Sequence, residues 1–374
     1  MNVLLWSTYV EHPVGGMERT SLEIALQLHQ RGHRVILAGA YDHAPELRAK
    51  IPANMPYYFF DMHRQRVKPH LAAARLAGRL MDQYQIQVVS AHGSVFALHE
   101  VCRRRKIPMV WTIHGASPRP PGIMNRLKTA AVRHVLTWQG THMVGVSRAT
   151  AECVHGEFPE MDASRVHSII TGGMNDTALA ALPLPQPGPP WELGFIGRIV
   201  QQKRPLDLVE VARGLEGHLD YRMHIFGDGP LLIELRKAVQ AVGLGGRFIF
   251  HGYWDKGTPG MVEQFQILVH PAEEEPLGLS IIESQLAARP VAAYKVGGIP
   301  EILREGITGM MVPMGDTTGL VAAVRSIAGP SFVNLSRGAR ERATQEFTIK
   351  HMIDQYEALL ERLSVSRLSG TALS

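Results

Sequence analysis

Cysteine is nearly absent from this chain of 374 residues, which contains only Cys102 and Cys153. Two cysteines cannot build a disulfide framework or a zinc cluster, so the sequence predicts a protein of a reducing compartment. Long apolar runs are absent too, since no stretch reaches the roughly 18 residues of a membrane span. The apolar first ten residues lack a basic leader, and we interpret them as a strand rather than a signal peptide. We therefore expect a cytoplasmic protein.

The usual acidic metal clamp is also missing. No two aspartates are spaced Asp-x-Asp, the arrangement that commonly holds a divalent cation against a diphosphate. The histidines are scattered, and His29 and His33 lie around Gly32 without a third ligand near them in the sequence. The sequence therefore predicts a protein that works without a metal and without a bound cofactor.

The net excess of basic over acidic residues is confined to the first half of the chain. Residues 1–185 contain 20 Lys/Arg and 13 Asp/Glu, whereas the remainder contains 19 and 21. Such an excess suits phosphates, an anionic membrane or nucleic acid, and it is equally typical of a solvated basic surface. The excess is modest for the length, and no platform of interleaved aromatic and basic residues occurs, so we do not expect nucleic acid as a partner.

One stretch bears on membrane contact. Residues 118–136, PRPPGIMNRLKTAAVRHVL, mix basic and apolar residues at helical spacing. This pattern is typical of a helix that rests on an anionic membrane. It is also typical of a buried helix with basic edges, and the residues alone leave both interpretations open. The first would make the protein peripheral on the inner face of the membrane.

What the sequence does contain is a regular alternation of short β-rich runs with helical patterns, which indicates parallel sheets covered by helices. In the first half the expected strands are 3–6, 35–40, 88–93, 109–115 and 143–147. After the proline-rich stretch LPLPQPGPP the expected strands are 192–197, 221–227, 247–252, 267–271 and 290–294.

This alternation predicts an α/β protein with two Rossmann-like domains, a number that suits the length of the chain. The first domain spans 1–181, a linker spans 182–191, and the second domain spans 192–347. A C-terminal helix at 348–374 is expected to pack back toward the first domain. Because ligands bind beyond the carboxyl ends of the strands in open α/β sheets, we expect the two sheets to face each other across a substrate cleft.

The stretch EEEPLGLSIIES (273–284) follows one of the expected strands. Gly278 can begin a helix there, with Leu279, Ile282 and Leu286 on its buried face and Glu283 off that face. The first amides of a helix are unpaired donors that bind phosphate.

Two carboxylates flank these amides, Glu275 before the helix and Glu283 within it. A nucleotide sugar would suit the arrangement, with its diphosphate on the amides and its hydroxyls on the carboxylates. The ordinary alternative is an acidic helix cap.

Further candidates follow other expected strands. Arg198 and Lys203 lie in GFIGRIVQQKRP (194–205), where two cations could stabilise a departing diphosphate or simply be solvated. The segments FGDGP and GGIPE are glycine turns of the second half. In the first half VGGME (14–18) follows the first strand, and His114 lies at a strand end.

Together these segments resemble the retaining glycosyltransferases of family 4, also called glycosyl transferases group 1, which have two Rossmann-like domains in the GT-B architecture. The ordered set is GGME, the mid-chain His-Gly, GRIVQQK, FGDGP, EPLGLSIIE and GGIPE, and it covers nearly the whole chain. Each motif is weak alone, but the order and the seven residues between Glu275 and Glu283 are specific.

The resemblance implies a role for each candidate. Glu275 contacts the donor sugar, Glu283 the ribose, and the backbone near Tyr253 the base. His114 faces the sugar near the reaction centre, and Gly16 lets its loop approach the donor phosphate and the acceptor. The implied catalytic set is Glu275, His114, Arg198 and Lys203. The implied donor-binding set is Gly16, Arg198, Lys203, Tyr253, Glu275, Gly278, Leu279, Ser280 and Glu283.

The implied activity is transfer of a hexose or N-acetylhexosamine from a UDP- or GDP-linked donor to a glycan, lipid-linked or small-molecule acceptor. We expect retention by front-face attack, in which the leaving diphosphate takes the acceptor's proton. The expected pathway is polysaccharide or glycoconjugate biosynthesis. An epimerase or phosphorylase of the same fold, or a non-catalytic sugar-nucleotide-binding protein, is the alternative. A dehydrogenase fits poorly because GDGPLL lacks the third glycine of a dinucleotide fingerprint.

The chain departs from the family at three places. Leu277 stands where an aromatic residue is common, and Ala288 where glycine is common. The segment IITGGMND (169–176) replaces a usual Pro-Asn-Gly-Val-Asp run before the linker.

Overall fold

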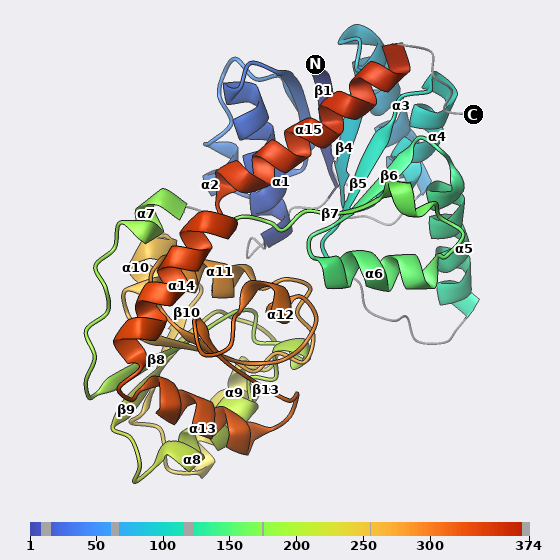
Figure 1. Ribbon diagram of the computed structural model, residues 1–374. Helices are drawn as coiled ribbons and strands as arrows, with labels where there is room; N and C mark the ends of the chain where they lie inside the picture. The colour runs from blue at the N-terminus through green and yellow to red at the C-terminus, as the bar shows by residue number, and fades with distance from the viewer. Residues whose placement is uncertain (9–15, 61–66, 116–122, 174–175, 255, 369–374) are drawn as a thin grey trace. The chain divides into compact units, whose positions relative to one another are not determined.

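The computed structural model describes residues 1–374 except 9–15, 61–66, 116–122, 174–175, 255 and 369–374 (Figure 1). The chain divides into two compact units. The first comprises residues 1–170 and 352–374, and the second comprises residues 171–351. Each unit has a parallel sheet with its own apolar core, so the predicted α/β fold with two Rossmann-like domains is confirmed.

The first unit is built on a seven-stranded sheet in the order β3-β2-β1-β4-β5-β6-β7, with every pairing parallel. The order reverses beside β1, which is the doubly wound arrangement of dinucleotide-binding folds. The strands are β1 (Asn2–Ser7), β2 (Arg34–Gly39), β3 (Tyr57–Phe59), β4 (Val88–His92), β5 (Met109–Ile113), β6 (Thr141–Gly145) and β7 (Val166–Ser168).

Helices connect these strands and cover the sheet (Figure 1). They are α1 (Gly16–Gln30), α2 (Pro45–Arg48), α3 (Val67–Gln83), α4 (Phe96–Arg105), α5 (Ile123–Thr137) and α6 (Arg148–Glu157), with short 3₁₀ turns at Tyr41–His43 and Ala163–Arg165. The last helix, α15 (Ile349–Leu368), belongs to this unit from Met352 onward. Arg31 fastens it by ion pairs to Asp354 at 2.8 Å and Glu357 at 2.5 Å.

The second unit has a six-stranded parallel sheet in the order β10-β9-β8-β11-β12-β13. The strands are β8 (Trp191–Ile196), β9 (Tyr221–Phe226), β10 (Phe248–Gly252), β11 (Ile267–His270), β12 (Val291–Tyr294) and β13 (Gly309–Val312). The helices are α7 (Asp176–Ala180), α8 (Asp207–Leu215), α9 (Leu232–Ala241), α10 (Thr258–Val262), α11 (Leu279–Leu286), α12 (Ile299–Ile302), α13 (Thr317–Ile327) and α14 (Phe332–Glu346), with a 3₁₀ turn at Gln201–Lys203.

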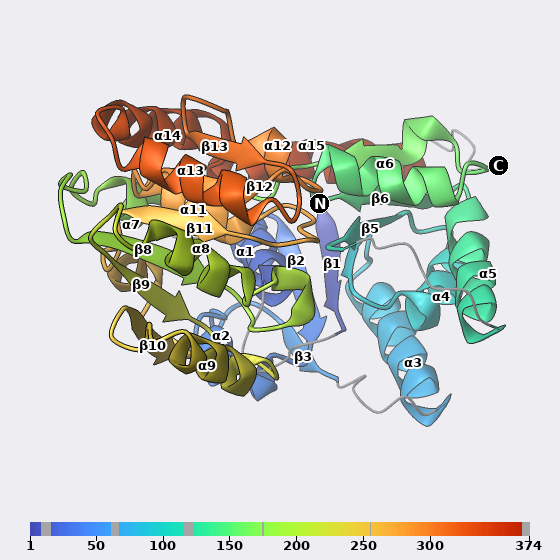
Figure 2. The same cartoon turned by 90° about the horizontal axis from the view of Figure 1, so that it is seen from below.

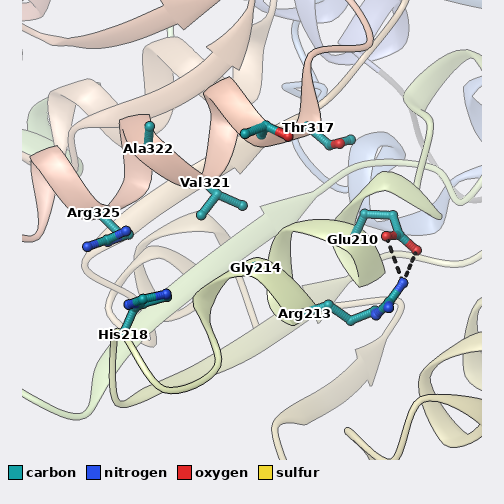
Figure 3. Close-up of a pocket in the computed structure, with 9 residues that line it drawn as sticks. Glu210, Arg213, Gly214, His218, Thr317, Val321, Ala322 and Arg325 are labelled. Carbon is teal, nitrogen blue, oxygen red and sulfur yellow. Dashed lines mark hydrogen bonds and ion pairs between the residues drawn. The ribbon is translucent and has the colours of Figure 1, made fainter.

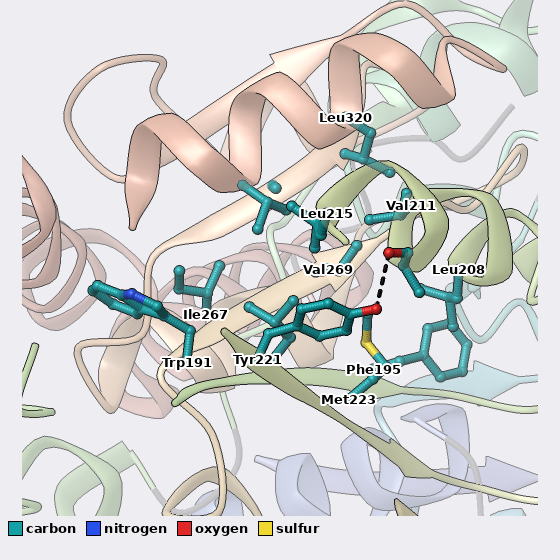
Figure 4. Packing of buried hydrophobic residues seen from close by; sticks show 14 of the residues in the cluster. Trp191, Phe195, Leu208, Val211, Leu215, Tyr221, Met223, Ile267, Val269 and Leu320 are labelled. Carbon is teal, nitrogen blue, oxygen red and sulfur yellow. Dashed lines mark hydrogen bonds between the residues drawn. The ribbon is translucent and has the colours of Figure 1, made fainter. Parts of the chain in front are cut away.

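Helices α8 and α13 pack side by side over one face of this sheet (Figure 2). Their apolar side chains meet Phe195 and Met223 from the strands (Figure 4). Tyr221 is buried in the same cluster, and its hydroxyl donates to the carbonyl of Ala212 at 2.8 Å, which satisfies its only polar atom. The buried residues of α11 lie outside this cluster, because α11 covers the opposite face.

The proline-rich segment differs from its prediction as an interdomain linker. Residues 171–181 and the segment that follows belong to the second unit. The reason is a set of side chains that donate to its carbonyls: Arg340 to Leu182 at 2.7 Å, and Gln266 to Gln186 at 2.5 Å. Helix α7 also contacts α11 and α14, so the first unit ends near residue 170 rather than 181.

Candidate functional site

The turn after β11 is set by Gly278. This residue precedes α11 with φ of +104°, a left-handed conformation that side chains disfavour. The helix therefore begins at Leu279, as the sequence predicts. Its first amides, those of Leu279 and Ser280, have no acceptor within the helix, which is the general condition for anion binding at a helix start.

Glu275 is buried between two donors. Its Oε2 accepts a hydrogen bond from Nζ of Lys203 at 2.5 Å and another from Nε2 of His270 at 2.8 Å. Burial alone would raise the pKa of Glu275, but the charge of Lys203 and the hydrogen bond from His270 outweigh it and hold the pKa at about 2. Glu275 is thus a fixed anion at neutral pH.

Neighbouring turns fix the backbone of this loop. The amide of Gly298 donates to the carbonyl of Glu275 at 2.9 Å. Gly297 has φ of +50°, and a Cβ added to it would lie 2.1 Å from that carbonyl oxygen. On the other side, the amide of Glu273 donates to the carbonyl of Gln202 at 2.9 Å. The loops after β8, β11 and β12 therefore meet at the carboxyl edge of the second sheet.

The two predicted cations share the loop after β8 but differ in surroundings. Lys203 is ion-paired with Glu275, whereas the Arg198 side chain is exposed. The glycine turn after β9 packs closely beneath this loop, since a Cβ on Gly227 would lie 1.9 Å from the carbonyl oxygen of Gly197. The structure thus brings Lys203 to the acidic motif and leaves Arg198 accessible in the same loop.

Glu283 was expected off the buried face of α11, and this prediction is wrong. Its side chain is only 3% exposed. Helix α11 is covered by the sheet on one side and by α7, α10 and α14 on the other, so residues 281–286 are all buried. Leu279, expected on the buried face, is only half-buried. Tyr253, beyond the end of β10, is 43% exposed.

The remaining predicted residues lie in the first unit. His114 follows β5, and its Nε2 lies 2.8 Å from Nδ1 of His92, the last residue of β4. Burial lowers the pKa of His114 to about 4, and burial together with the charge of His114 lowers the pKa of His92 well below its usual range. The pair is therefore uncharged at neutral pH. Gly16 opens α1, while residues 14–15 of the GGME turn lie outside the described residues.

Sequence reasoning misses His92 and His270. Both end parallel strands, at the edge where ligands bind in such sheets. A signal exists for each: His92 lies in AHG, which echoes the IHG around His114, and His270 lies five residues before Glu275. The sequence does not show that His92 meets His114, because the two residues come from different strands.

His33, which has no third ligand near it in the sequence, gains carboxylate neighbours from far along the chain. Glu357 and Glu361 of α15 lie beside it, with Nε2 of His33 2.6 Å from Glu357. Arg31 binds the other oxygen of Glu357 at 2.5 Å, so the group forms an ion-pair cluster. A second histidine and carboxylate cluster among the described residues comprises His99, Glu100 and His134. Metal-independent activity remains a prediction.

A groove of about 540 Å³ lies between α8 and α13 (Figure 3). Arg213 pairs there with Glu210 at 3.1 Å, and the side chains of His218 and Arg325 line the other end. None of the predicted site residues lines this groove.

The basic amphipathic stretch forms α5, of which the part before residue 129 is outside the residues with described side chains. Val132, Val135 and Leu136 pack into the first core, and Arg133 pairs with Glu160. This part of the helix has a buried face with a basic edge. Within the described ranges, no helix has the length and apolar character needed to cross a membrane.

Comparison with known proteins gives matches to both units. The family model described as Glycosyltransferase Family 4 matches residues 14–172, and that described as Glycosyl transferases group 1 matches residues 191–329. The 2-deoxystreptamine glucosyltransferase of Streptomyces kanamyceticus is 27% identical over 69% of this chain and 71% of its own. The N-acetyl-alpha-D-glucosaminyl L-malate synthase of Bacillus anthracis is 22% identical over 92% of this chain and 93% of its own.

Solved structures share the fold. A glycosyltransferase from Rickettsia africae matches with a TM-score of 0.81 at 18% identity, over 97% of this chain and 98% of its own. Anabaena Alr3699/HepE in complex with UDP-glucose matches with a TM-score of 0.75 at 17% identity, over 97% of this chain and 100% of its own.

Proposed function

Because the chain belongs to the family 4 glycosyltransferases, also described as glycosyl transferases group 1, we propose that it transfers a sugar from a nucleoside diphosphate donor with retention at the anomeric carbon. The observation that carries the proposal is the meeting of Glu275, Lys203 and the start of α11 at one sheet edge. A buried anion next to a cation and a helix start suits a ligand that carries both hydroxyls and phosphates.

We propose UDP-glucose or UDP-N-acetylglucosamine as the donor, with GDP-linked sugars as the alternative. Support comes from the HepE complex with UDP-glucose and from relatives named as glucosyl- and N-acetylglucosaminyltransferases. As acceptor we propose a small hydroxylated molecule, supported by the 2-deoxystreptamine and L-malate in the names of two relatives. A screen of acceptors could instead select a glycan, or a lipid-linked acceptor at an anionic membrane.

The proposed reaction is a front-face displacement. The bond from C1 to the leaving phosphate oxygen breaks, and the acceptor oxygen bonds to C1 on the same face. The leaving diphosphate takes the acceptor's proton. Arg198, Lys203 and the amides of Leu279 and Ser280 would stabilise the charge that develops on the diphosphate. Glu275 would position the sugar rather than attack it, with Glu283 toward the ribose and His114 toward the sugar.

A thermal-shift screen of nucleotide sugars tests the donor, because a bound ligand raises the melting temperature with its concentration. Transfer assays on the best donor, followed by NMR of the product's anomeric centre, test retention. Inversion, or a covalent sugar adduct trapped on Glu275, would contradict the mechanism. Product formed without an acceptor would indicate an epimerase, and phosphate as the preferred acceptor would indicate a phosphorylase.

A further inference from the structure

The carboxylate of Glu275 is held by one oxygen only. Lys203 and His270 both donate to Oε2, and Oε1 takes part in none of the hydrogen bonds among the described residues. A substrate hydroxyl could therefore bond to Oε1 without displacing either donor. The asymmetry divides the carboxylate into an anchored oxygen and an available one.

The two donors are not equivalent. The Lys203 side chain is 20% exposed on a loop, so its ammonium can leave Oε2 without unfolding. His270 is fully buried at the end of β11 and cannot move away. A carboxylate oxygen accepts only, so Nε2 of His270 carries the proton. Its Nδ1 is buried and has no hydrogen-bond partner among the described residues, which fits the tautomer with a single proton on Nε2.

We infer that His270 is a positioning residue, which keeps Oε2 of Glu275 anchored while Lys203 moves to the donor diphosphate and Oε1 binds the donor sugar. This inference rests on the proposed function. Without His270, departure of Lys203 would leave a buried carboxylate with no protein donor, and such a group rotates away or takes up a proton. The imidazole thus lets one lysine serve the sugar-binding carboxylate in the free enzyme and the diphosphate in the complex.

Two substitutions test the inference. His270→Leu removes the donor, and we expect kcat/KM with the UDP-sugar to fall roughly 10- to 100-fold, the value of a hydrogen bond to a charged group. Binding of UDP should weaken as well, because its diphosphate also draws Lys203 away from Glu275 and it has no sugar hydroxyl to offer the carboxylate in exchange. His270→Gln places an amide donor near the position of Nε2 and should restore most of the activity.

A matched control is available in the same sheet. His224 on β9 is also buried, and its Nε2 also lies 2.8 Å from a carboxylate oxygen, that of Glu192. His224→Leu should leave both kcat/KM with the UDP-sugar and the affinity for UDP unchanged. Equal kcat/KM in wild type and His270→Leu, or a His270→Gln variant as impaired as His270→Leu, would overturn the inference.

The proton position gives a second readout that does not depend on activity. Long-range ¹H–¹⁵N spectra of the wild type should show His270 protonated on Nε2 alone, and protonation on Nδ1 would contradict the inference even if His270→Leu does not fold. If the wild type binds no nucleotide sugar, the proposed function fails. If it binds and transfers while His270→Leu behaves like wild type, only the role of His270 fails.

Discussion

The carboxyl edges of the two sheets carry opposite chemistry. In the second unit a buried carboxylate keeps its charge because Lys203 and His270 bind it. In the first unit His92 and His114 bond to each other, and burial keeps both uncharged at neutral pH. A fixed anion beside a cation suits the donor, and neutral imidazoles suit sugar hydroxyls. Two sheets of similar fold therefore differ at their carboxyl edges: the second unit has a charged pair of side chains there, and the first has a neutral pair of histidines.

Removing the charge from the second edge should have the largest effect. Glu275→Gln keeps the side-chain size, and we expect kcat/KM to fall roughly 10²- to 10³-fold, as when a preorganised polar group is lost. The measurement is transfer from the preferred UDP-sugar. Glu192→Gln is the control, because Glu192 also pairs with a histidine and with a cation, here Arg222, but lies at the start of β8. An equal loss in both variants would remove the distinction that we draw.

Displacing the loop that carries Glu275 should have the next largest effect. Gly297→Ala strains a left-handed residue and pushes a Cβ toward the carbonyl of Glu275, so we expect a loss of about 1–3 kcal/mol in unfolding free energy and weaker donor binding. Gly243→Ala has a similar φ of +75° with no atom within 4 Å of the added Cβ. It should cost stability alone. Donor binding that survives Gly297→Ala would show that this turn does not fix Glu275.

The two units should differ in their stability at acid pH. In the first unit the pKa values of His99, His114 and His142 are about 4, lowered mainly by burial. The unfolded chain binds these protons near pH 6.5, so stability is full above that pH and falls toward pH 4, by about 1.4 kcal/mol per pH unit for each group. Glu275 has a folded pKa of about 2, so its contribution is lost only between pH 4.5 and 2.

Hydrogen exchange followed peptide by peptide from pH 7 to pH 4 checks this order. We expect amides of the first sheet to open at higher pH than those of the second. His99→Leu should shift the opening of the first unit to lower pH, because it removes one of the protonation sites. Simultaneous opening of both sheets, or earlier opening of the second, would contradict the assignment.

The smallest effect concerns α11. Ala288 follows this helix with φ of +62°, which costs a side chain roughly 1–2 kcal/mol. Ala288→Gly should therefore stabilise the second unit by about 0.5–1 kcal/mol after the greater freedom of glycine in the unfolded chain is subtracted. Ala287→Gly, at φ of −81°, should destabilise it by about as much. Chemical denaturation of the three proteins makes the comparison, and a loss of stability in both variants would exclude strain at residue 288.

The sequence predicts the alternation of strands and helices because each β-rich run is short and bounded by turn residues. It also predicts the start of α11, because Gly278 marks it locally. What it misses depends on contacts distant in sequence. Glu283 is buried because three helices cover α11. The proline-rich segment is held by Arg340 and Gln266 from far along the chain. Ala288 is informative too, since its left-handed conformation is one that glycine adopts without strain and that the sequence does not mark.

The most direct test of the account is a crystal structure of the protein with its UDP-sugar donor. We predict the diphosphate on the amides of Leu279 and Ser280, the sugar on Oε1 of Glu275, and Lys203 moved from Oε2 to a phosphate oxygen while His270 stays in place. A nucleotide bound elsewhere, with the start of α11 empty, would contradict it.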